Sequence, residues 1–406
     1  MKVLIFAHRL EIGGTQFNAI ELGATLRDRH GFDVLLWATP GPMLSLVERK
    51  GLRYVAAPDA RLHPSPMRMQ ALRALVRQEK PDLIHAWDWW QGLEAYYATH
   101  LPMKVPLLVT DMMFDFTRML PKAVPTTFGT PQLVERAAKA GWKRPELLLP
   151  PVDVVQNAPD AVDARPFREQ FGVRDDEITL VTVSRLAEFM KADGIVRTVE
   201  AVRRVGRDLP LKALIVGDGA ARPRLQAMAD EVNAELGRAA VVLTGPLNDP
   251  RPAYAAADIV IGMSGSVMRA MAFGKPVIIQ GWRGFAAFFS PDTAPTFHYT
   301  GMYGTGDGDP SNQRLSDAIR QLAGDASLRA ELGQFGRDFI LQNHALDVVA
   351  PRLAQFCRSA CEETPRLPVI AKDALRTAMI YCRERRFLTP SRDLLPTDRK
   401  PLWKLS

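Results

Sequence analysis

The first half of the chain alternates short apolar runs with longer segments in which apolar residues recur every three to four positions. The short runs predict buried strands, and the spaced segments predict amphipathic helices. Such alternation is typical of βαβ units, in which helices cover both faces of a parallel sheet. The predicted elements are the strand KVLIF, a helix over 15–29, the strand DVLLWA, a helix over 66–79, the strand DLIHAW, a helix over 89–99, the strand PLLVT and a helix over 130–140.

The second half repeats the pattern after a proline-rich stretch at about 150–166, which we interpret as a linker. Its predicted elements are the strand EITLVTVSRL, a helix over 189–206, the strand LKALIVGDG, a helix over 220–236, the strand AVVLTG, a short helix over 250–256, the strand DIVIGM, a short helix that begins at GSVMR and the strand PVIIQ. From about residue 312 onward the spacing of apolar residues is helical, and a last helix is predicted over 371–386.

These elements predict an α/β protein with the GT-B architecture, in which two Rossmann-like, doubly wound parallel-sheet domains face a central cleft. The N-terminal domain is expected to span 1–158, joined by the helix at 371–386, and the C-terminal domain to span 163–360. Open α/β sheets bind ligands beyond the carboxyl ends of their strands, so we expect the site in the cleft.

Composition and charge narrow the classes of ligand. The chain has 406 residues, of which 47% are hydrophobic and 24% charged, as expected for a globular protein of two domains. The net charge of +7 and the pI of about 9.4 favour phosphate-bearing ligands or an anionic membrane surface. The positive charge is scattered, with one compact tract at Arg383–Arg386, which argues against nucleic acid as the partner.

Cysteine content and the absence of apolar spans indicate the compartment. Three cysteines, Cys357, Cys361 and Cys382, do not form a disulfide framework and fit a reducing environment. The N-terminus, MKVLIFAHRL, lacks the features of a signal peptide, and no apolar run reaches the length of a membrane span. We expect a cytoplasmic protein, with peripheral contact at the inner membrane face and the oligomeric state left open. No metal-binding cluster is visible in the sequence.

Two groups of residues in the first half are candidates for ligand binding. Gly13 and Gly14 precede a predicted helix, where glycines allow close approach and helix amides attract anions, although a simple tight turn gives the same pattern. His85 and Asp88 are expected at the end of a strand facing the cleft, where either could orient a ligand hydroxyl. The alternative for His85 is a histidine at the end of the strand whose hydrogen bonds are satisfied by the protein itself.

Cations follow a predicted strand in the second half. Arg185 ends the strand, and Lys191 lies just beyond it, an arrangement that suits a diphosphate because Arg can bind two oxygens while Lys adds a point charge. The alternative is that both are solvated surface residues. Gly217 follows the next strand, in the segment IVGDGAARPRL, and is also a candidate ligand-binding residue. The segment lacks the third glycine of a dinucleotide fingerprint, which disfavours a nicotinamide site, and a packing turn is the better interpretation there.

A small-residue turn opens the helix GSVMRAMA, which is an anion-binding arrangement. Arg269 is expected in the first turn of this helix, where the helix dipole disfavours a cation unless an anion lies nearby. Arg283, after the next strand, either reaches phosphate or is exposed. The candidate anion-binding residues of the turn are Ser264, Gly265, Ser266 and Val267.

Four of these segments occur in the order EIGGTQ, VSRLAEFMK, IVGDGAARPRL and GMSGSVMRAMAFGKPVI. In this order they resemble the retaining GT-B glycosyltransferases of family 4, over roughly residues 1–345. GGTQ is similar to the glycine loop of the family's first domain, and AMAFGKPVI to its EAMAxGxPV segment. The resemblance implies sugar transfer from a nucleotide-diphosphate sugar to an acceptor hydroxyl with retention, without a metal or other cofactor. It also implies that Arg185 and Lys191 hold the donor diphosphate. The acceptor could be a sugar, a lipid-linked molecule or a small molecule.

The sequence also departs from the family pattern. The family usually has two glutamates about eight residues apart, the second of which contacts the ribose hydroxyls; here Arg269 takes that position and the earlier acid is missing. The family's histidine after the fourth or fifth strand would fall near Asp111. We therefore expect Arg269 to face the nucleotide and Asp111 to take part in catalysis. Two alternatives are a non-catalytic binder of nucleotide sugars and a nucleotide-sugar 2-epimerase on the same fold.

Overall fold

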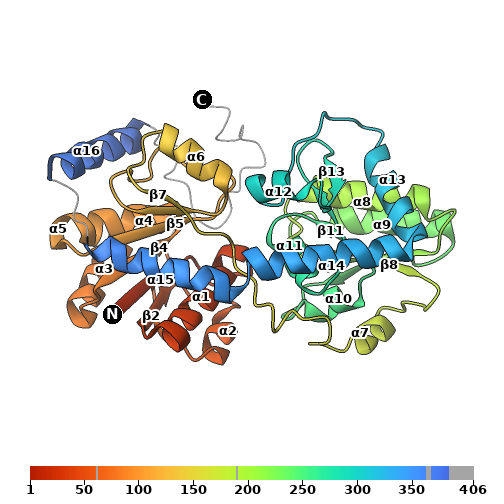
Figure 1. Cartoon of the computed structure of the whole chain (residues 1–406), viewed down its shortest axis with the longest axis horizontal. Helices are drawn as coiled ribbons and strands as arrows, with labels where there is room; N and C mark the ends of the chain where they lie inside the picture. The colour runs from red at the N-terminus through yellow and green to blue at the C-terminus, as the bar shows by residue number, and fades with distance from the viewer. Residues whose placement is uncertain (61–62, 189–190, 363–366, 384–406) are drawn as a thin grey trace. The chain divides into compact units, whose positions relative to one another are not determined.

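A computed structural model describes residues 1–60, 63–188, 191–362 and 367–383 of the chain. They form two compact units (Figure 1). Unit 1 consists of Met1–Pro151 and the described part of 346–406, and unit 2 of Val152–Ala345. Because the structure defines each unit by itself, the central cleft stays a prediction.

Unit 1 contains a seven-stranded parallel sheet with the strand order β3-β2-β1-β4-β5-β6-β7. The strand order reverses between β1 and β4, which is the kind of switch point where open α/β sheets bind ligands. The strands are β1 (Lys2–Phe6), β2 (Asp33–Ala38), β3 (Arg53–Ala56), β4 (Leu83–Trp87), β5 (Leu107–Asp111), β6 (Thr126–Phe128) and β7 (Pro145–Leu147).

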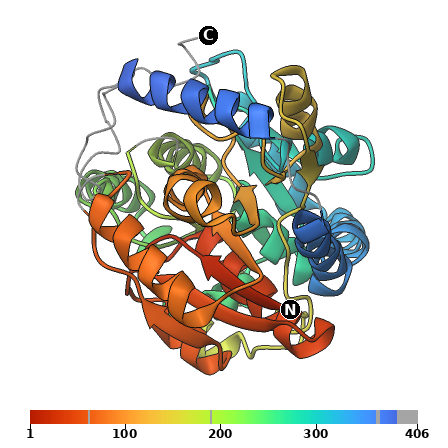
Figure 2. The same cartoon turned by 90° about the vertical axis from the view of Figure 1, so that its left-hand side faces the viewer.

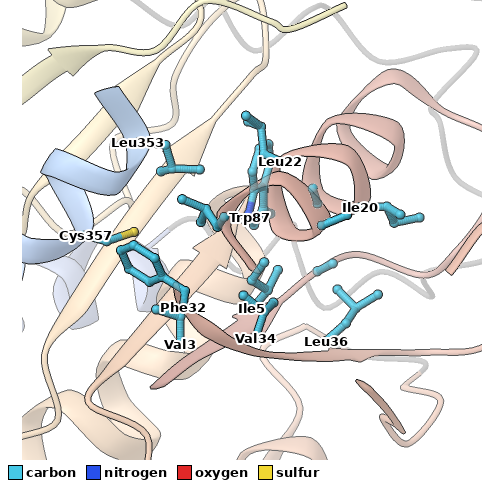
Figure 3. Packing of buried hydrophobic residues seen from close by; sticks show 14 of the residues in the cluster. Val3, Ile5, Ile20, Leu22, Phe32, Val34, Leu36, Trp87, Leu353 and Cys357 are labelled. Atoms are coloured by element: carbon cyan, nitrogen blue, oxygen red, sulfur yellow. The ribbon is translucent and has the colours of Figure 1, made fainter. Parts of the chain in front are cut away.

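Helices cover both faces of this sheet. One face packs against α1 and α15, and Figure 3 shows Leu353 and Cys357 of α15 reaching toward Trp87 and Phe32. The other face packs against α3, α4 and η1. The helical segments of unit 1 are α1 (Gly14–His30), α2 (Leu44–Arg49), α3 (Pro66–Glu79), α4 (Trp89–Ala95), the π-helix η1 (Tyr96–His100), α5 (Leu101–Met103), α6 (Pro131–Lys139), α15 (Leu346–Glu362) and α16 (Leu367–Arg383).

Unit 2 contains a six-stranded sheet with the order β10-β9-β8-β11-β12-β13. All pairs are parallel except that of β12 with β13. The strand order reverses between β8 and β11, so unit 2 has its own switch point. The strands are β8 (Ile178–Val183), β9 (Leu211–Val216), β10 (Val241–Gly245), β11 (Ile259–Gly262), β12 (Val277–Gln280) and β13 (Ala286–Phe288).

The helices of unit 2 also lie on both faces of the sheet. Helices α8, α9 and α13 contribute to one apolar core, and α10, α11 and α14 to the other. The helices are α7 (Arg165–Gln170), α8 (Ala192–Val205), α9 (Arg222–Leu236), α10 (Arg251–Ala256), α11 (Gly265–Ala272), α12 (Ala294–Thr300), α13 (Gln313–Gly324) and α14 (Ala326–Asn343). Across the described ranges of both units, no helix has the length and apolar character needed to span a bilayer.

The expected end of the second domain at residue 360 differs from the structure, in which unit 2 ends at Ala345. The reason is α15, whose buried residues Val349, Leu353 and Cys357 belong to the same core as Trp87 of unit 1. The predicted last helix at 371–386 corresponds to α16, which begins four residues earlier, at Leu367; residues 384–386 lie outside the described ones.

Replacement of Leu353 tests the contribution of α15 to the core of unit 1. Its side chain is fully buried, so Leu353→Ala should lower the free energy of unfolding by about 2–5 kcal/mol. Guanidinium unfolding followed by tryptophan fluorescence measures this, since Trp87 lies in the same core. The control Leu375→Ala, at a side chain 62% exposed, should change stability by less than about 0.5 kcal/mol. Equal effects of the two substitutions would contradict the assignment.

Candidate functional site

In unit 2, two loops leave neighbouring strands at the carboxyl edge of the switch point. Strands β8 and β11 pair in parallel, with Leu180 opposite Ile259 and Val181 opposite Val260. The chain that continues from β8 carries Arg185, and the chain that continues from β11 opens α11. The register therefore brings the loop that carries Arg185 and the turn at Ser264 to the same edge of the sheet.

Arg185 and Lys191 lie close enough to interact electrostatically. Arg185 is exposed two residues beyond β8, and Lys191 occupies the cap position just before α8. Burial, together with the neighbouring Arg185 guanidinium, lowers the pKa of Lys191 to about 8. Two cations held near each other, one of them poorly hydrated, form a local excess of positive charge that an anion would relieve.

The loop that carries Arg185 rests on a glycine turn after β9. Gly217 has a φ of +138°, and a Cβ atom there would lie 1.9 Å from the carbonyl oxygen of Ser184. Leu186 N donates to Asp218 O at 2.9 Å, and Ser184 N donates to Val216 O at 3.0 Å. Gly217 is therefore a close-approach residue that fixes the backbone around Arg185, and its contact with a donor stays a prediction.

The turn before α11 is strained. Ser264 has a φ of +54°, which is uncommon for a residue with a side chain, and its amide donates to Met302 O at 2.9 Å. Ser266 Oγ donates to Met263 O at 3.2 Å. The first amides of a helix have no partner within the helix, so those of Gly265, Ser266 and Val267 point toward this turn.

The structure corrects the expected position of Arg269. Helix α11 has only eight residues, and Arg269 belongs to its last turn, where the helix dipole favours a cation. Its Nη1 nevertheless lies 3.4 Å from Gly265 O, because helical side chains lean toward the N-terminus. The residue is half-buried and interacts electrostatically with the buried Tyr254. Its contact with a nucleotide stays a prediction.

Arg283 is held by a neighbouring loop. Its φ is +54°, its Nη2 donates to Asp307 O at 2.8 Å, and its carbonyl accepts from Gly308 N at 3.0 Å. The guanidinium thus has a structural partner within unit 2, and we expect it to order the loop that begins after β12.

In unit 1, three polar side chains form one row at the carboxyl edge of neighbouring strands. Phe6 of β1 pairs with Ala86 of β4, so two residues further along His8 lies opposite Asp88. Trp87 pairs with Thr110 of β5, so Asp88 is followed across the sheet by Asp111. The row His8–Asp88–Asp111 therefore crosses the switch point of unit 1.

Asp111 is the most unusual carboxyl group of this row. It is 1% exposed, Oδ1 accepts from Met113 N at 3.0 Å, and no partner for Oδ2 is present among the described residues. Burial and the charge of Asp88 raise the pKa of Asp111 well above its usual value. A raised pKa favours the protonated carboxyl group over the carboxylate, and a protonated carboxyl group can donate a hydrogen bond.

Asp88 has a strained backbone. Its φ is +79°, its Oδ1 accepts from Trp89 N at 2.7 Å, and its own amide donates to Thr110 O at 2.7 Å. The capping bond holds one carboxylate oxygen at the start of α4 and leaves the other able to accept from a ligand. Non-glycine residues with positive φ gather at functional sites, which fits the position of Asp88 at the switch point.

His85, predicted to end the strand and face the cleft, is instead the third residue of the five-residue strand β4 and is fully buried. Its Nε2 lies 2.6 Å from Thr110 Oγ1, which lies 2.7 Å from Thr127 Oγ1. Burial lowers the pKa of His85 to about 3, so the ring is neutral. The alternative interpretation also differs from the structure, because His85 lies within the strand and its Nδ1 is buried without a hydrogen-bond partner among the described residues.

His8 was not selected from the sequence, although it belongs to this row. Burial lowers the pKa of His8 and the carboxylate of Asp88 raises it; His63 and Arg68 also lower it. Arg68 donates to both carboxylate oxygens of the buried Glu94, at 2.6 and 2.7 Å, and its Nη2 lies 2.7 Å from His63 Nδ1. The signal in the sequence was the position of His8 two residues after an apolar run.

The glycine pair lies where the sequence predicted, at the start of α1. Gly13 is the cap residue in an extended conformation, and Phe17 N donates to its carbonyl at 3.1 Å. A Cβ atom on Gly14 would meet nothing within 4 Å of the described chain, whereas one on Gly13 would meet the Gln16 side chain at 2.5 Å. The space at Gly14 is open to a ligand, and its role in binding stays a prediction.

Groups of three or more His, Cys, Asp or Glu that could hold a metal ion do not occur among the described residues. Cys357 is buried in the core of unit 1, where burial raises the pKa of its thiol and keeps it protonated.

Comparisons with family models match both units. A model described as Glycosyltransferase Family 4 matches residues 12–111, and a model described as Glycosyl transferases group 1 matches residues 177–325. The first match includes the glycine pair, Asp88 and Asp111, and the second includes Arg185, Lys191 and α11. No curated protein sequence matches the chain significantly.

Solved structures resemble the chain over nearly their whole length. A glycosyltransferase from Rickettsia africae is 13% identical with a TM-score of 0.70, covering 89% of this chain and 99% of that one. Anabaena HepE, solved with UDP and glucose, is 17% identical with a TM-score of 0.69, covering 88% and 100%. A Neisseria meningitidis UDP-GlcNAc 2-epimerase bound to UDP-GlcNAc is 12% identical with a TM-score of 0.60, covering 88% and 100%. Together with the two parallel-sheet units, these likenesses confirm the GT-B fold.

Substitution of Gly217 tests the close approach beneath Arg185. Gly217→Ala should lower the free energy of unfolding by about 2–4 kcal/mol, because the added Cβ collides with a backbone oxygen. The matched control is Gly237→Ala, since Gly237 also has a positive φ, +64°, but open space around the Cβ position within the described chain. Its cost should be limited to the backbone strain of about 1–2 kcal/mol. Thermal unfolding of both variants gives the comparison, and equal losses would contradict the steric argument.

Proposed function

Because the chain belongs to the group 1, family 4 type of GT-B glycosyltransferases, we propose that it moves a hexosyl group from a nucleotide-diphosphate sugar to an acceptor hydroxyl with retention of the anomeric configuration. The observation that carries the proposal is the interacting pair Arg185 and Lys191, which follows β8 at the switch point of unit 2, at the sheet edge where α11 also begins. The complex of Anabaena HepE with UDP and glucose supports a UDP-hexose as the first donor to test.

In the proposed reaction, the bond between the sugar and the diphosphate breaks, and negative charge develops on the leaving oxygen. Arg185 and Lys191 stabilise that charge, and the amides at the start of α11 add donors that need no reorganisation. Lys191 gains most from the interaction, because it is poorly hydrated without an anion. These side-chain cations take the place of a metal ion in the proposal.

Retention requires no protein nucleophile in this proposal, since the leaving diphosphate can deprotonate the incoming acceptor hydroxyl on the same face of the sugar. The row His8–Asp88–Asp111 then serves to hold sugar or acceptor hydroxyls. Asp111, whose pKa is raised by burial and by the charge of Asp88, and Asp88 supply carboxyl oxygens to these hydroxyls. His85 has no role here, because it is buried within β4.

Slow hydrolysis of the donor tests the proposal without knowledge of the acceptor. The wild-type chain should release UDP from UDP-glucose, also in the presence of a metal chelator, and Arg185→Ala should reduce that rate by about 100-fold or more. Arg207→Ala is the matched control, because Arg207 is an exposed arginine that follows the far end of α8 and pairs with Glu235 at 3.6 Å.

Two outcomes would replace the proposed transferase, and a third would change only its stereochemistry. Binding of donors without turnover under any acceptor would favour the non-catalytic binder. Formation of a 2-epimer from UDP-GlcNAc would favour the epimerase, whose fold the chain shares. Inversion at the anomeric carbon in a transfer product, measured by NMR coupling constants, would contradict retention while leaving the transferase in place.

The pKa of Lys191 predicts the pH dependence of donor affinity. The ammonium group binds the diphosphate, and the bound anion raises the pKa above the free value of about 8. The affinity for UDP should therefore be highest below pH 8 and should fall as the pH rises through 8, by about tenfold between pH 7 and 9.5. Calorimetric titration of UDP over this range measures the change. Lys191→Arg, which stays charged, should bind UDP with nearly constant affinity; a wild-type profile as flat as that of the variant would contradict the assignment.

A further inference from the structure

Helix α16 packs on unit 1 through its polar side. Asp373 is 7% exposed, and its Oδ2 accepts from Lys122 N at 2.9 Å and from Ala123 N at 3.0 Å. Thr377, one turn further along, is fully buried. The inward face of the helix therefore carries the residues that a surface helix usually turns to water.

Further hydrogen bonds fix this orientation. Arg376 donates through Nη1 to Arg118 O at 2.6 Å and through Nη2 to Leu120 O at 2.9 Å. Tyr97 Oη, from η1, donates to Ala374 O at 2.7 Å. These bonds attach α16 to two separate segments of unit 1, so the helix cannot turn over without losing several of them. Figures 1 and 2 both show α16 at the edge of unit 1.

The outward face of α16 is apolar with a basic border. Leu375 is 62% exposed and Met379, one turn further along, is 57% exposed, while Leu367 at the start of the helix is 76% exposed. Lys372 and Arg383 are the exposed charged residues of the helix, and both are basic. This pattern is the reverse of the one expected for a helix that packs its apolar face inward, and it leaves large apolar side chains in water.

A pocket lies beside the same helix. The pocket has a volume of about 380 Å³ and lies between α3, α4, η1 and α16. One wall combines apolar side chains with Arg73 and Tyr97, and the other wall is formed by Ala378, Tyr381 and Cys382 of α16. Exposed apolar side chains on a surface helix match the acyl region of a lipid bilayer better than they match water.

The positive charge of the chain favours a bilayer with anionic headgroups. The chain carries a net charge of +7, and residues 384–406, which follow α16 directly, contain six Lys or Arg and three Asp or Glu. The same stretch includes Phe387 and Trp403, and aromatic residues of these types prefer the interface of a bilayer. Basic residues at the border of an apolar helix face, here Lys372 and Arg383, attract anionic headgroups.

We propose that the outer face of α16, formed by Leu375 and Met379 with Lys372 and Arg383 at its border, binds the surface of an anionic lipid bilayer. Insertion of the two apolar side chains removes their surface from water, and the two cations approach the headgroups. The inward hydrogen bonds keep the helix in place on unit 1 while it does so. This proposal goes beyond the proposed transferase activity and does not depend on it.

Sedimentation of the full chain with vesicles tests the proposal. The wild-type protein should sediment with vesicles of phosphatidylcholine and phosphatidylglycerol and much less with phosphatidylcholine alone, and salt should weaken the binding. Leu375→Ser combined with Met379→Ser should reduce the affinity for the anionic vesicles by at least about tenfold. Lys372→Glu should reduce it as well and make the remaining binding less sensitive to salt.

A matched control removes the same number of exposed apolar residues elsewhere. Val155→Ser combined with Leu341→Ser changes side chains that are 76% and 37% exposed in unit 2, and it should leave vesicle binding intact. All variants should keep the wild-type thermal midpoint, since they alter exposed positions. The proposal is overturned if the wild type does not bind anionic vesicles, or if both double variants bind equally well. It is also overturned if sedimentation velocity shows that Leu375 and Met379 hold two copies of the chain together.

Discussion

Every strand of a parallel sheet ends at the same edge, and this constraint decides where chemistry can occur in both units. The residues after β8 and β11 meet at one point of unit 2, and the residues after β1, β4 and β5 meet at one point of unit 1. The core on each side of the sheet fixes the register, and the register then sets which polar side chains become neighbours. Lys191 and Asp111 have shifted pKa values because this edge is crowded and poorly hydrated.

The long, strongly periodic elements could be predicted from the sequence, and the short ones could not. Strands such as KVLIF and the helix over 66–79 were found because buried strands and amphipathic helices leave repeated patterns. Strands β6, β7 and β13 have three residues each, which is too few for a pattern to stand out. The end of unit 2 was misjudged because α14 and α15 are consecutive helices that both bury apolar residues, and only tertiary packing assigns them to different units.

The candidate site illustrates the same limit at the level of single residues. His85 and His8 lie near similar apolar runs, yet one is in the middle of its strand and the other beyond the end of its strand. An error of two or three residues in the end of a strand exchanges a core residue for one at the edge. Arg269 was misplaced for a related reason: α11 is so short that its first and last turns nearly meet, and a shift of one residue reverses the sign of the helix dipole.

The division of the chain has a consequence for its synthesis. Unit 2 is continuous in sequence, whereas unit 1 needs α15, which ends at Glu362. A ribosome therefore delivers the whole of unit 2 before it delivers the residues that close the core around Trp87 and Phe32. Until then the first 151 residues expose an apolar sheet face, and this is the period in which they are open to aggregation or to chaperone binding. The unit that begins the chain is the last to be completed.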